Sequence, residues 1–307
     1  MDTAITAETR KKRLKKGAQG WLRALPFILP GLILVAVFVV YPMLFTIRIS
    51  LSEYKIVQGD ITFIGLENFK NVLEGGSRFW YAYRNNFLYA IVTVPFIILG
   101  GMFFAYLINN LRRGQGIFRV GFYLPVITSW VAAAVVWQWV LSGKYGLLNQ
   151  MLATVGIQGP AWLSSATWAM PGIVLASVWK DTGYYALMVL AALKSIDPGY
   201  YEAADLDGAS GAKKFFSITL PLISPTLFLL IVINIIYGLQ VFDSVLIMTD
   251  GGPGGATTVF LERIYKYAFV QYKMGMASTY ACILFVVLLL FTAVQFWMQK
   301  RWVNYDA

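Results

Sequence analysis

Six long apolar runs dominate this sequence. Crossing a lipid bilayer takes about 20 helical residues at about 1.5 Å per residue, and each run is at least that long. They are Leu25–Ile47, Phe87–Leu111, Phe118–Leu141, Trp168–Leu193, Leu220–Met248 and Ala277–Met298. Only 13% of the 307 residues are charged, whereas soluble domains contain roughly 25%. The sequence therefore predicts an all-α integral membrane protein with six transmembrane helices.

The basic residues predict how the chain is oriented, because lysine and arginine collect in cytosolic loops beside the spans. One side of the predicted bundle has a dense basic segment before the first run and basic residues after the second, fourth and sixth runs. These are Arg10, Lys11, Lys12, Arg13, Lys15, Lys16, Arg23, Arg112, Arg113, Arg119, Lys194, Lys213, Lys214, Lys300 and Arg301. Both termini are therefore expected in the cytosol.

This orientation divides the chain into three parts. We expect a basic cytosolic segment over residues 1–24, a six-helix domain over 25–298 and a cytosolic tail over 299–307. The basic N-terminal run is expected to contact anionic lipid headgroups. No nucleic-acid partner is expected, because the positive charge flanks the spans and no recognition motif accompanies it.

The chain lacks the residues that most catalytic and metal sites need. It has no histidine, and its single cysteine, Cys282, lies within the last apolar run. These facts argue against zinc sites, internal disulfides and histidine-activated nucleophiles. The glycine- and lysine-containing segment Gly208–Lys214 differs from a phosphate-binding loop in its glycine spacing and lacks a hydroxyl residue after the lysine. We expect a non-catalytic chain that binds no metal or cofactor and does not hydrolyse ATP itself.

The polar segment between the fourth and fifth runs has clear helix signals. Asp197 before Pro198 predicts a helix start, because the carboxylate can cap the helix and proline suits the first helical position. The helix should extend to Leu206 and end in a turn at Asp207–Gly208. Its small residues allow a partner to approach closely, and Glu202 is available to a basic residue of that partner. From these residues alone, the segment is either a docking helix or a solvated connection between two spans.

The same segment contains E-A-A at Glu202–Ala204, then Gly208 and finally I-x-L-P at Ile218–Pro221. This order and spacing resemble the EAA loop in the permease subunits of binding-protein-dependent ABC importers. Further motifs resemble the sugar-type permeases, the group that includes the maltose and glycerol-3-phosphate permeases. They are Tyr123–Pro125, Val178–Lys180, Leu190–Leu193, Ile196, Gln240–Asp243 and Met248–Pro253.

The resemblance implies a type I ABC importer permease fold in a bacterial inner or plasma membrane. It also implies a heterodimer with a second permease, two ATP-binding cassette subunits that carry the ATP and Mg, an extracytoplasmic solute-binding protein and a sugar substrate. Coupling to the ATPases is expected through the loop 197–221. The residues implied in it are Glu202, Ala203, Ala204, Asp207, Gly208, Ile218, Leu220 and Pro221.

Polar residues inside the runs are candidates for the translocation pathway, because they are costly in lipid unless they face a bundle interior or a watery cavity. Helical spacing places Ser177, Asp181 and Tyr184 on one face. It groups Gln240, Asp243 and Ser244 on another. Sugars also pack on aromatic rings, so the candidates are Ser129, Trp130, Trp137, Ser177, Lys180, Asp181, Tyr184, Gln240, Asp243 and Ser244. Helix–helix hydrogen bonding remains an alternative for each, as does pairing with Asp181 for Lys180.

Two other functional classes remain open. An ion-coupled secondary transporter should have a relay of carboxylates or an inverted repeat with broken helices, and the apolar runs contain no glutamate. A membrane-embedded enzyme without histidine would need a Ser/Lys or two-Asp site, for which adjacent Lys180 and Asp181 are a weak basis. Co-purification with an ATPase would favour the importer.

Overall fold

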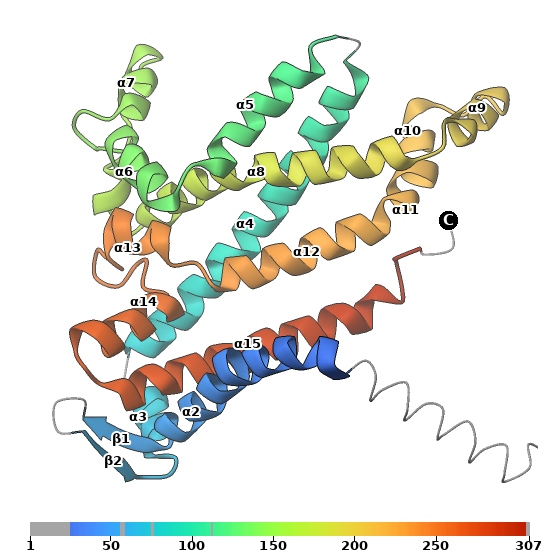
Figure 1. The fold of residues 1–307 in the computed structure, drawn as a ribbon. Helices are drawn as coiled ribbons and strands as arrows, with labels where there is room; N and C mark the ends of the chain where they lie inside the picture. The colour runs from blue at the N-terminus through green and yellow to red at the C-terminus, as the bar shows by residue number, and fades with distance from the viewer. Residues whose placement is uncertain (1–24, 56–58, 75–76, 112, 305–307) are drawn as a thin grey trace, which may run out of the picture.

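The computed structural model describes residues 25–55, 59–74, 77–111 and 113–304. The described chain is mostly helical (Figure 1). A small antiparallel hairpin of β1 (Ser52–Lys55) and β2 (Asp60–Phe63) pairs Ser52 with Phe63. The predicted basic segment 1–24 and residues 305–307 of the predicted tail lie outside the described residues.

Four helices in the described chain are long and apolar enough to cross a membrane: Leu25–Ser50, Arg78–Asn110, Ser224–Thr249 and Met274–Gln299. A fifth candidate is the bent pair α5 (Gln115–Ile127) and α6 (Trp130–Val140), which meet at 97°. The fourth predicted span corresponds to α8 (Ala169–Ser195), a continuous helix of 27 residues that falls outside this set. The structure thus gives four or five candidate spans, where the sequence predicted six.

The third predicted span is broken, so the expectation of one continuous helix over Phe118–Leu141 was wrong. The helix α5 ends at Ile127, and the backbone is extended at Thr128 and Ser129 before α6 begins at Trp130. The Ser129 hydroxyl caps α6 by accepting a hydrogen bond from the backbone N–H of Ala132 at 3.1 Å. Such a cap satisfies a donor that the break would otherwise leave free.

The fifth predicted span corresponds to the candidate Ser224–Thr249, whose helix is interrupted at residues 240–242. The helix α12 (Ser224–Leu239) ends before Gln240, and α13 (Asp243–Thr249) begins after Phe242. Gln240 therefore does not lie on the same helix as Asp243 and Ser244, and the helical spacing predicted for these three residues is corrected. Fully buried Asn86 of α4 (Ser77–Asn110) donates to the Leu239 carbonyl at 2.8 Å, so this helix end keeps a partner.

The core of the bundle surrounds α8. Its most extensive contact is with α4, where Gly101 allows close packing because an added Cβ would lie 2.9 Å from the Cβ of Tyr185. On α5, the Phe122 carbonyl oxygen occupies the position that a Cβ on Gly183 would need. Buried aliphatic side chains of α4, α8 and α12, including Ile97, Val189 and Leu230, fill the space between these helices.

The loops between the helices collect at two ends of the bundle (Figure 1). One end holds the hairpin, α3 (Glu67–Glu74), α7 (Leu147–Thr154), α13 and α14 (Phe260–Tyr265). The other holds the start of the first helix, the C-terminal residues and the connection between α8 and α12.

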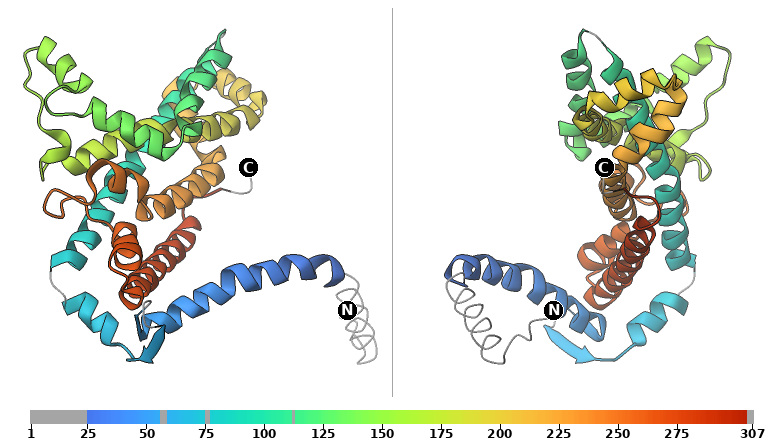
Figure 2. Two further views of the ribbon diagram at one scale, coloured as in Figure 1. Left: turned by 60° about the vertical axis from the view of Figure 1, so that its left-hand side comes forward. Right: turned by 90° about the vertical axis from the view of Figure 1, so that its right-hand side faces the viewer.

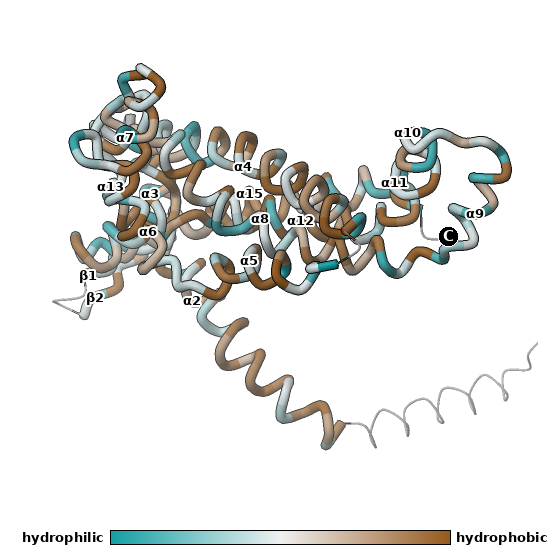
Figure 3. The backbone as a smooth tube through the Cα atoms, turned by 90° about the horizontal axis from the view of Figure 1, so that it is seen from above, coloured by the Kyte–Doolittle hydropathy of each residue, from teal (hydrophilic) through white to brown (hydrophobic). Residues whose placement is uncertain are grey.

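The first helix, Leu25–Ser50, extends away from the other helices (Figure 2), and the apolar window that defines it is 0% buried. Hydrophobic residues occur along the whole of this helix and along the helices of the bundle (Figure 3). Its last turn contacts α15 (Met274–Gln299) near Ser50, whose carbonyl accepts from Thr279 at 3.3 Å. The rest of the helix presents apolar side chains that no other part of the described structure covers.

Candidate functional site: the polar loop and the membrane interior

The helix predicted in the polar loop is confirmed with the same bounds. Helix α9 covers Pro198–Leu206, and Asp197 caps it by accepting a hydrogen bond from the Gly199 N–H at 2.9 Å. Gly208 follows with a φ of +71°, a conformation that favours glycine. The Ala209 N–H then closes the end by donating to the Ala204 carbonyl at 2.9 Å. Local sequence signals therefore determine both ends of this helix.

One face of helix α9 packs against its own chain, and the other face is exposed. Ala204 is buried, and the hydroxyls of Tyr201 and Thr219 are hydrogen-bonded at 2.8 Å. On the other face Glu202 is exposed, and Leu206 is 91% exposed. A free-standing apolar side chain beside a carboxylate is what a protein partner could bind. The helix is thus fixed to its own chain and open toward the outside of the bundle.

The second half of the loop is a series of short helical segments that leads into the start of α12. Helix α10 (Gly211–Lys214) starts at the Ser210 cap and continues through a short π-helical segment, Phe215–Thr219, into α11 (Leu220–Leu222). Lys214 forms an ion pair with Asp205 of α9. Among the predicted coupling residues, Glu202, Ala203, Asp207 and Gly208 are exposed, Ala204 is buried, and Ile218, Leu220 and Pro221 are half-buried.

Lys180 of α8 is buried, with 5% of the residue exposed, and its ammonium faces the end of α5. The Nζ donates hydrogen bonds to the carbonyls of Pro125 and Val126, both at 3.1 Å. It also lies 5.3 Å from the ring centroid of Trp130. No ion pair joins Lys180 to Asp181 in the described structure, so the pairing considered from sequence is replaced by backbone contacts.

The other predicted pathway residues differ in their accessibility. Ser177 is fully buried, and its hydroxyl donates to the Ile173 carbonyl of its own helix at 2.9 Å. Ser244 is also buried. Trp130, Trp137, Asp181 and Tyr184 are half-buried, and Ser129, Gln240 and Asp243 are exposed. On the predicted face of α8, Asp181 and Tyr184 are therefore partly accessible, whereas Ser177 is not.

Three amides outside the predicted pathway set connect distant parts of the chain: Asn85 and Asn86 are buried, and Gln138 is half-buried. Asn86 accepts from the Phe260 N–H at 2.9 Å while donating to Leu239, and neighbouring Asn85 donates to the carbonyls of Gly255 and Thr258 at 2.8 and 3.0 Å. Gln138 of α6 donates to the Ile247 carbonyl at the end of α13. Their signal in the sequence is an amide within an apolar run, where an unpaired polar group would be costly.

At the opposite end of the bundle, a buried acid anchors the glycine-rich loop after α13. Glu262 is fully buried and forms ion pairs with Arg263 at 3.0 Å and Lys266 at 2.9 Å. Lys266 also pairs with Asp250 at 3.0 Å. Burial of the Lys266 ammonium works to lower its pKa, but its hydrogen bonds to Glu262 and Asp250 outweigh this effect and raise the pKa above its usual value. The loop is therefore held in a defined position by charge.

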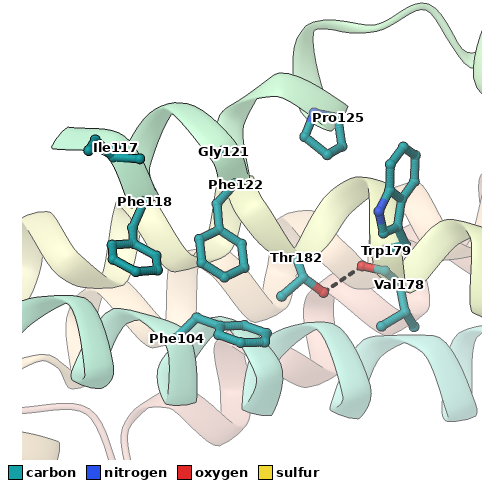
Figure 4. Close-up of a pocket in the computed structure, with 9 residues that line it drawn as sticks. All are labelled: Phe104, Ile117, Phe118, Gly121, Phe122, Pro125, Val178, Trp179 and Thr182. Atoms are coloured by element: carbon teal, nitrogen blue, oxygen red, sulfur yellow. Dashed lines mark hydrogen bonds between the residues drawn. The ribbon is translucent and has the colours of Figure 1, made fainter. Parts of the chain in front are cut away.

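A cavity of about 490 Å³ lies between α4, α5 and α8 (Figure 4). It is lined by Phe104, Ile117, Phe118, Gly121, Phe122, Pro125, Val178, Trp179 and Thr182. The only side-chain hydroxyl in this lining, that of Thr182, donates to the Val178 carbonyl of its own helix. A sugar needs several hydrogen-bonding groups, so this apolar cavity does not suit one.

Comparison with known proteins gives consistent results. Residues 77–304 match the family described as "Binding-protein-dependent transport system inner membrane component". The chain is 35% identical to the trehalose/maltose transport system permease protein MalF of Thermococcus litoralis, over 96% of this chain and 97% of that protein. It is 31% identical to the lactose transport system permease protein LacF of Rhizobium radiobacter, over 94% of this chain and 96% of that protein.

A solved structure has the same architecture. It is a bacterial alginate ABC transporter in complex with alginate pentasaccharide-bound periplasmic protein, and one of its chains matches with a TM-score of 0.80 and 26% identity. The match covers 94% of this chain and 98% of that chain. The fold is therefore that of an ABC importer permease. Together with the family match over residues 77–304, this likeness means that the chain belongs to the binding-protein-dependent transport system inner membrane components, a family of integral membrane transport proteins.

Proposed function

We propose that this chain is the non-catalytic permease subunit of an ATP-driven, binding-protein-dependent importer of a sugar or oligosaccharide. The observation that carries the proposal is α9, a capped helix with an exposed carboxylate and an exposed leucine at one end of the bundle. The relatives support the substrate class, because one is a trehalose/maltose permease and another a lactose permease. The predicted coupling role of the loop 197–221 belongs to this proposal.

The proposed assembly contains a second permease, two cytosolic ATP-binding cassette subunits that bind ATP and Mg, and an extracytoplasmic solute-binding protein. The apolar helix Leu25–Ser50 supports a further membrane subunit, because most of its length is uncovered by the described residues and is free to pack against a helix of that subunit. The periplasmic protein bound to the alginate transporter supports the solute-binding partner.

The proposed topology has six spans and cytosolic termini. Counting α8 and the bent pair α5–α6 as spans, beside the four long apolar helices, gives six crossings. An even number of crossings leaves both termini on one side, which agrees with the start of the first helix lying at the same end as the C-terminal residues and α9 (Figure 1). The basic loop residues support the cytosol as that side.

The proposed pathway passes the half-buried and exposed members of the predicted set. Asp181 and Tyr184 of α8 supply a carboxylate and an aromatic ring, and Trp130 and Trp137 supply further ring faces. Gln240 and Asp243 are exposed at the interruption of the fifth span. Such a mixture suits a polyhydroxylated solute, whose hydroxyls need donors and acceptors while its ring packs on aromatic planes.

A substitution on the exposed face of α9 tests the proposal. Leu206→Asp places a charge where we expect an apolar contact, so it should release the ATPase from the purified complex and lower ATP-driven sugar uptake by roughly tenfold or more. Met151→Asp is the matched control, because Met151 is an exposed apolar residue on α7 at the opposite end. We expect normal ATPase recovery with this control.

Two results would contradict the proposal. One is full ATPase recovery and full uptake with Leu206→Asp. The other is sugar uptake driven by an ion gradient in liposomes that contain this chain alone. That second result would instead favour the ion-coupled secondary transporter.

A further inference from the structure

We infer that Lys180 is a positioning residue: it holds the third span in its broken form by capping the end of α5, and thereby places Ser129 and Trp130 in the pathway. The ammonium is not a sugar ligand in this assignment. The inference rests on the proposed function for its transport consequence, whereas the capping role concerns this chain alone.

The carbonyl groups at the end of α5 show why a cap is needed. A helix leaves its last carbonyls without intrahelical partners, and an unsatisfied carbonyl is energetically costly in lipid. Here the Leu124 carbonyl accepts from the Thr128 hydroxyl at 2.9 Å. The Pro125 carbonyl accepts from the Thr128 N–H at 3.3 Å and from Lys180. The Val126 carbonyl accepts from Lys180, which is its only hydrogen-bond donor in the described structure.

Charge favours the same contact. The C-terminal end of a helix carries a partial negative charge, so a cation is stabilised there. The face of Trp130, the first residue of α6, provides a second attraction for the ammonium at 5.3 Å. Lys180 therefore contacts both sides of the break, α5 through two carbonyls and α6 through the indole ring.

The helix that carries Lys180 is well fixed for this role. Gly183 brings α8 against the Phe122 carbonyl of α5, and Gly101 brings α4 against α8 on its other side. Because α8 cannot move away from α5 without opening this contact, the ammonium meets the end of α5 at a defined position. A lysine on a loosely packed helix would not determine the bend angle.

A similar arrangement is found at the interruption of the fifth span and near the end of α13. Asn86 of α4 donates to the carbonyl of Leu239, the last residue of α12, and Gln138 of α6 donates to the Ile247 carbonyl near the end of α13. In each case a polar side chain from another helix donates to a carbonyl at or near a helix end. Lys180 is the charged member of this group.

Spin-label distances in the assembled transporter test the inference. One label goes on α5 at Val120 and one on α6 at Val135, both exposed, after Cys282→Ser removes the native cysteine. Lys180→Met removes the donors but keeps most of the side-chain length, so the inter-label distances should lengthen or broaden. Lys180→Arg keeps a charged donor and should retain the wild-type distances. Lys144→Met, on an exposed lysine in an outer loop, is the control.

Uptake measurements on the same variants test the consequence for transport. With Lys180→Met, the maximal uptake rate should fall roughly tenfold or more, while the half-saturating concentration of binding protein stays the same. Lys180→Arg should restore most of the rate. Rescue by arginine together with restored label distances separates positioning from a general loss of packing.

Two outcomes would overturn the inference. Unchanged label distances in Lys180→Met would remove the capping role, and altered distances with normal uptake would remove the transport role. Should Lys180→Met fail to assemble, Lys180→Leu replaces it, because its apolar side chain also lacks the donors; wild-type distances there overturn the inference equally. If the wild-type complex transports no sugar, the proposed function fails, while the label distances still decide the capping role.

Discussion

At the scale of single residues, most buried polar side chains of the described chain serve backbone groups. Lys180, Asn86 and Asn85 each donate to carbonyls on other elements, as does half-buried Gln138, and Ser177 donates within its own helix. This division of roles narrows the search for solute-binding groups. A polar residue in an apolar span is a pathway candidate only when its side chain is not already hydrogen-bonded to a backbone group.

Asp181 is the strongest remaining candidate by this criterion. It is half-buried, and no hydrogen bond or ion pair holds its carboxylate within the described residues. We predict that Asp181→Asn lowers sugar uptake roughly tenfold without loss of assembly, because a hydrogen bond to a charged group contributes about 1.5–3 kcal/mol. Ser177→Ala is the control and should transport normally, since Ser177 is sealed inside the bundle. Wild-type uptake by Asp181→Asn in proteoliposomes would remove Asp181 from the pathway.

At the scale of helices, close packing around α8 has a direct test. An alanine at Gly183 would overlap the Phe122 carbonyl oxygen, whereas a Cβ added to Gly121 meets nothing within 4 Å. We predict that Gly183→Ala destabilises the complex by about 1–3 kcal/mol, the usual cost of overpacking, and that Gly121→Ala has little effect. Thermal unfolding of the purified complex measures both. Equal melting temperatures for the two variants would show that α5 and α8 are not closely packed in the assembly.

The helices also show which parts of the structure the sequence could predict. The signals for α9 lie within it or beside it, at Asp197 and Gly208, and its bounds were predicted correctly. At the break in the third span the polar partner is Lys180, 55 residues from Pro125, and at the break in the fifth it is Asn86, 153 residues from Leu239. Such partners are known only once the helices are packed, so the sequence predicted continuous spans.

The candidate site was also predicted only in part, because residue types can be read from the sequence and packing cannot. The polar and aromatic residues of the pathway were found because their types are unusual in lipid, but their accessibility was not predictable. Ser177 and Asp181 are one helical turn apart, yet the first is sealed and the second half-buried. Grouping Gln240 with Asp243 and Ser244 assumed an unbroken helix, which the interruption at residues 240–242 contradicts.

At the scale of the whole molecule, the proposed orientation predicts which loops are reachable from outside the cell. In a Cys282→Ser background, Tyr145→Cys should react with a membrane-impermeant maleimide in intact cells, because Tyr145 is 67% exposed in the loop before α7. Arg113→Cys, in the short connection between α4 and α5, should react only after the membrane is opened. The reverse pattern would contradict the proposed topology.

The unbroken length of α8 has a mechanical consequence. Its 27 residues form a rod about 40 Å long, at about 1.5 Å per residue. Only Ile196 and Asp197 separate this rod from α9. A rigid arm of that length that pivots at its middle by about 10° swings each tip by about 3.5 Å. A small displacement of the α9 end of this rod would therefore be matched by a displacement of equal size, in the opposite direction, at its other end.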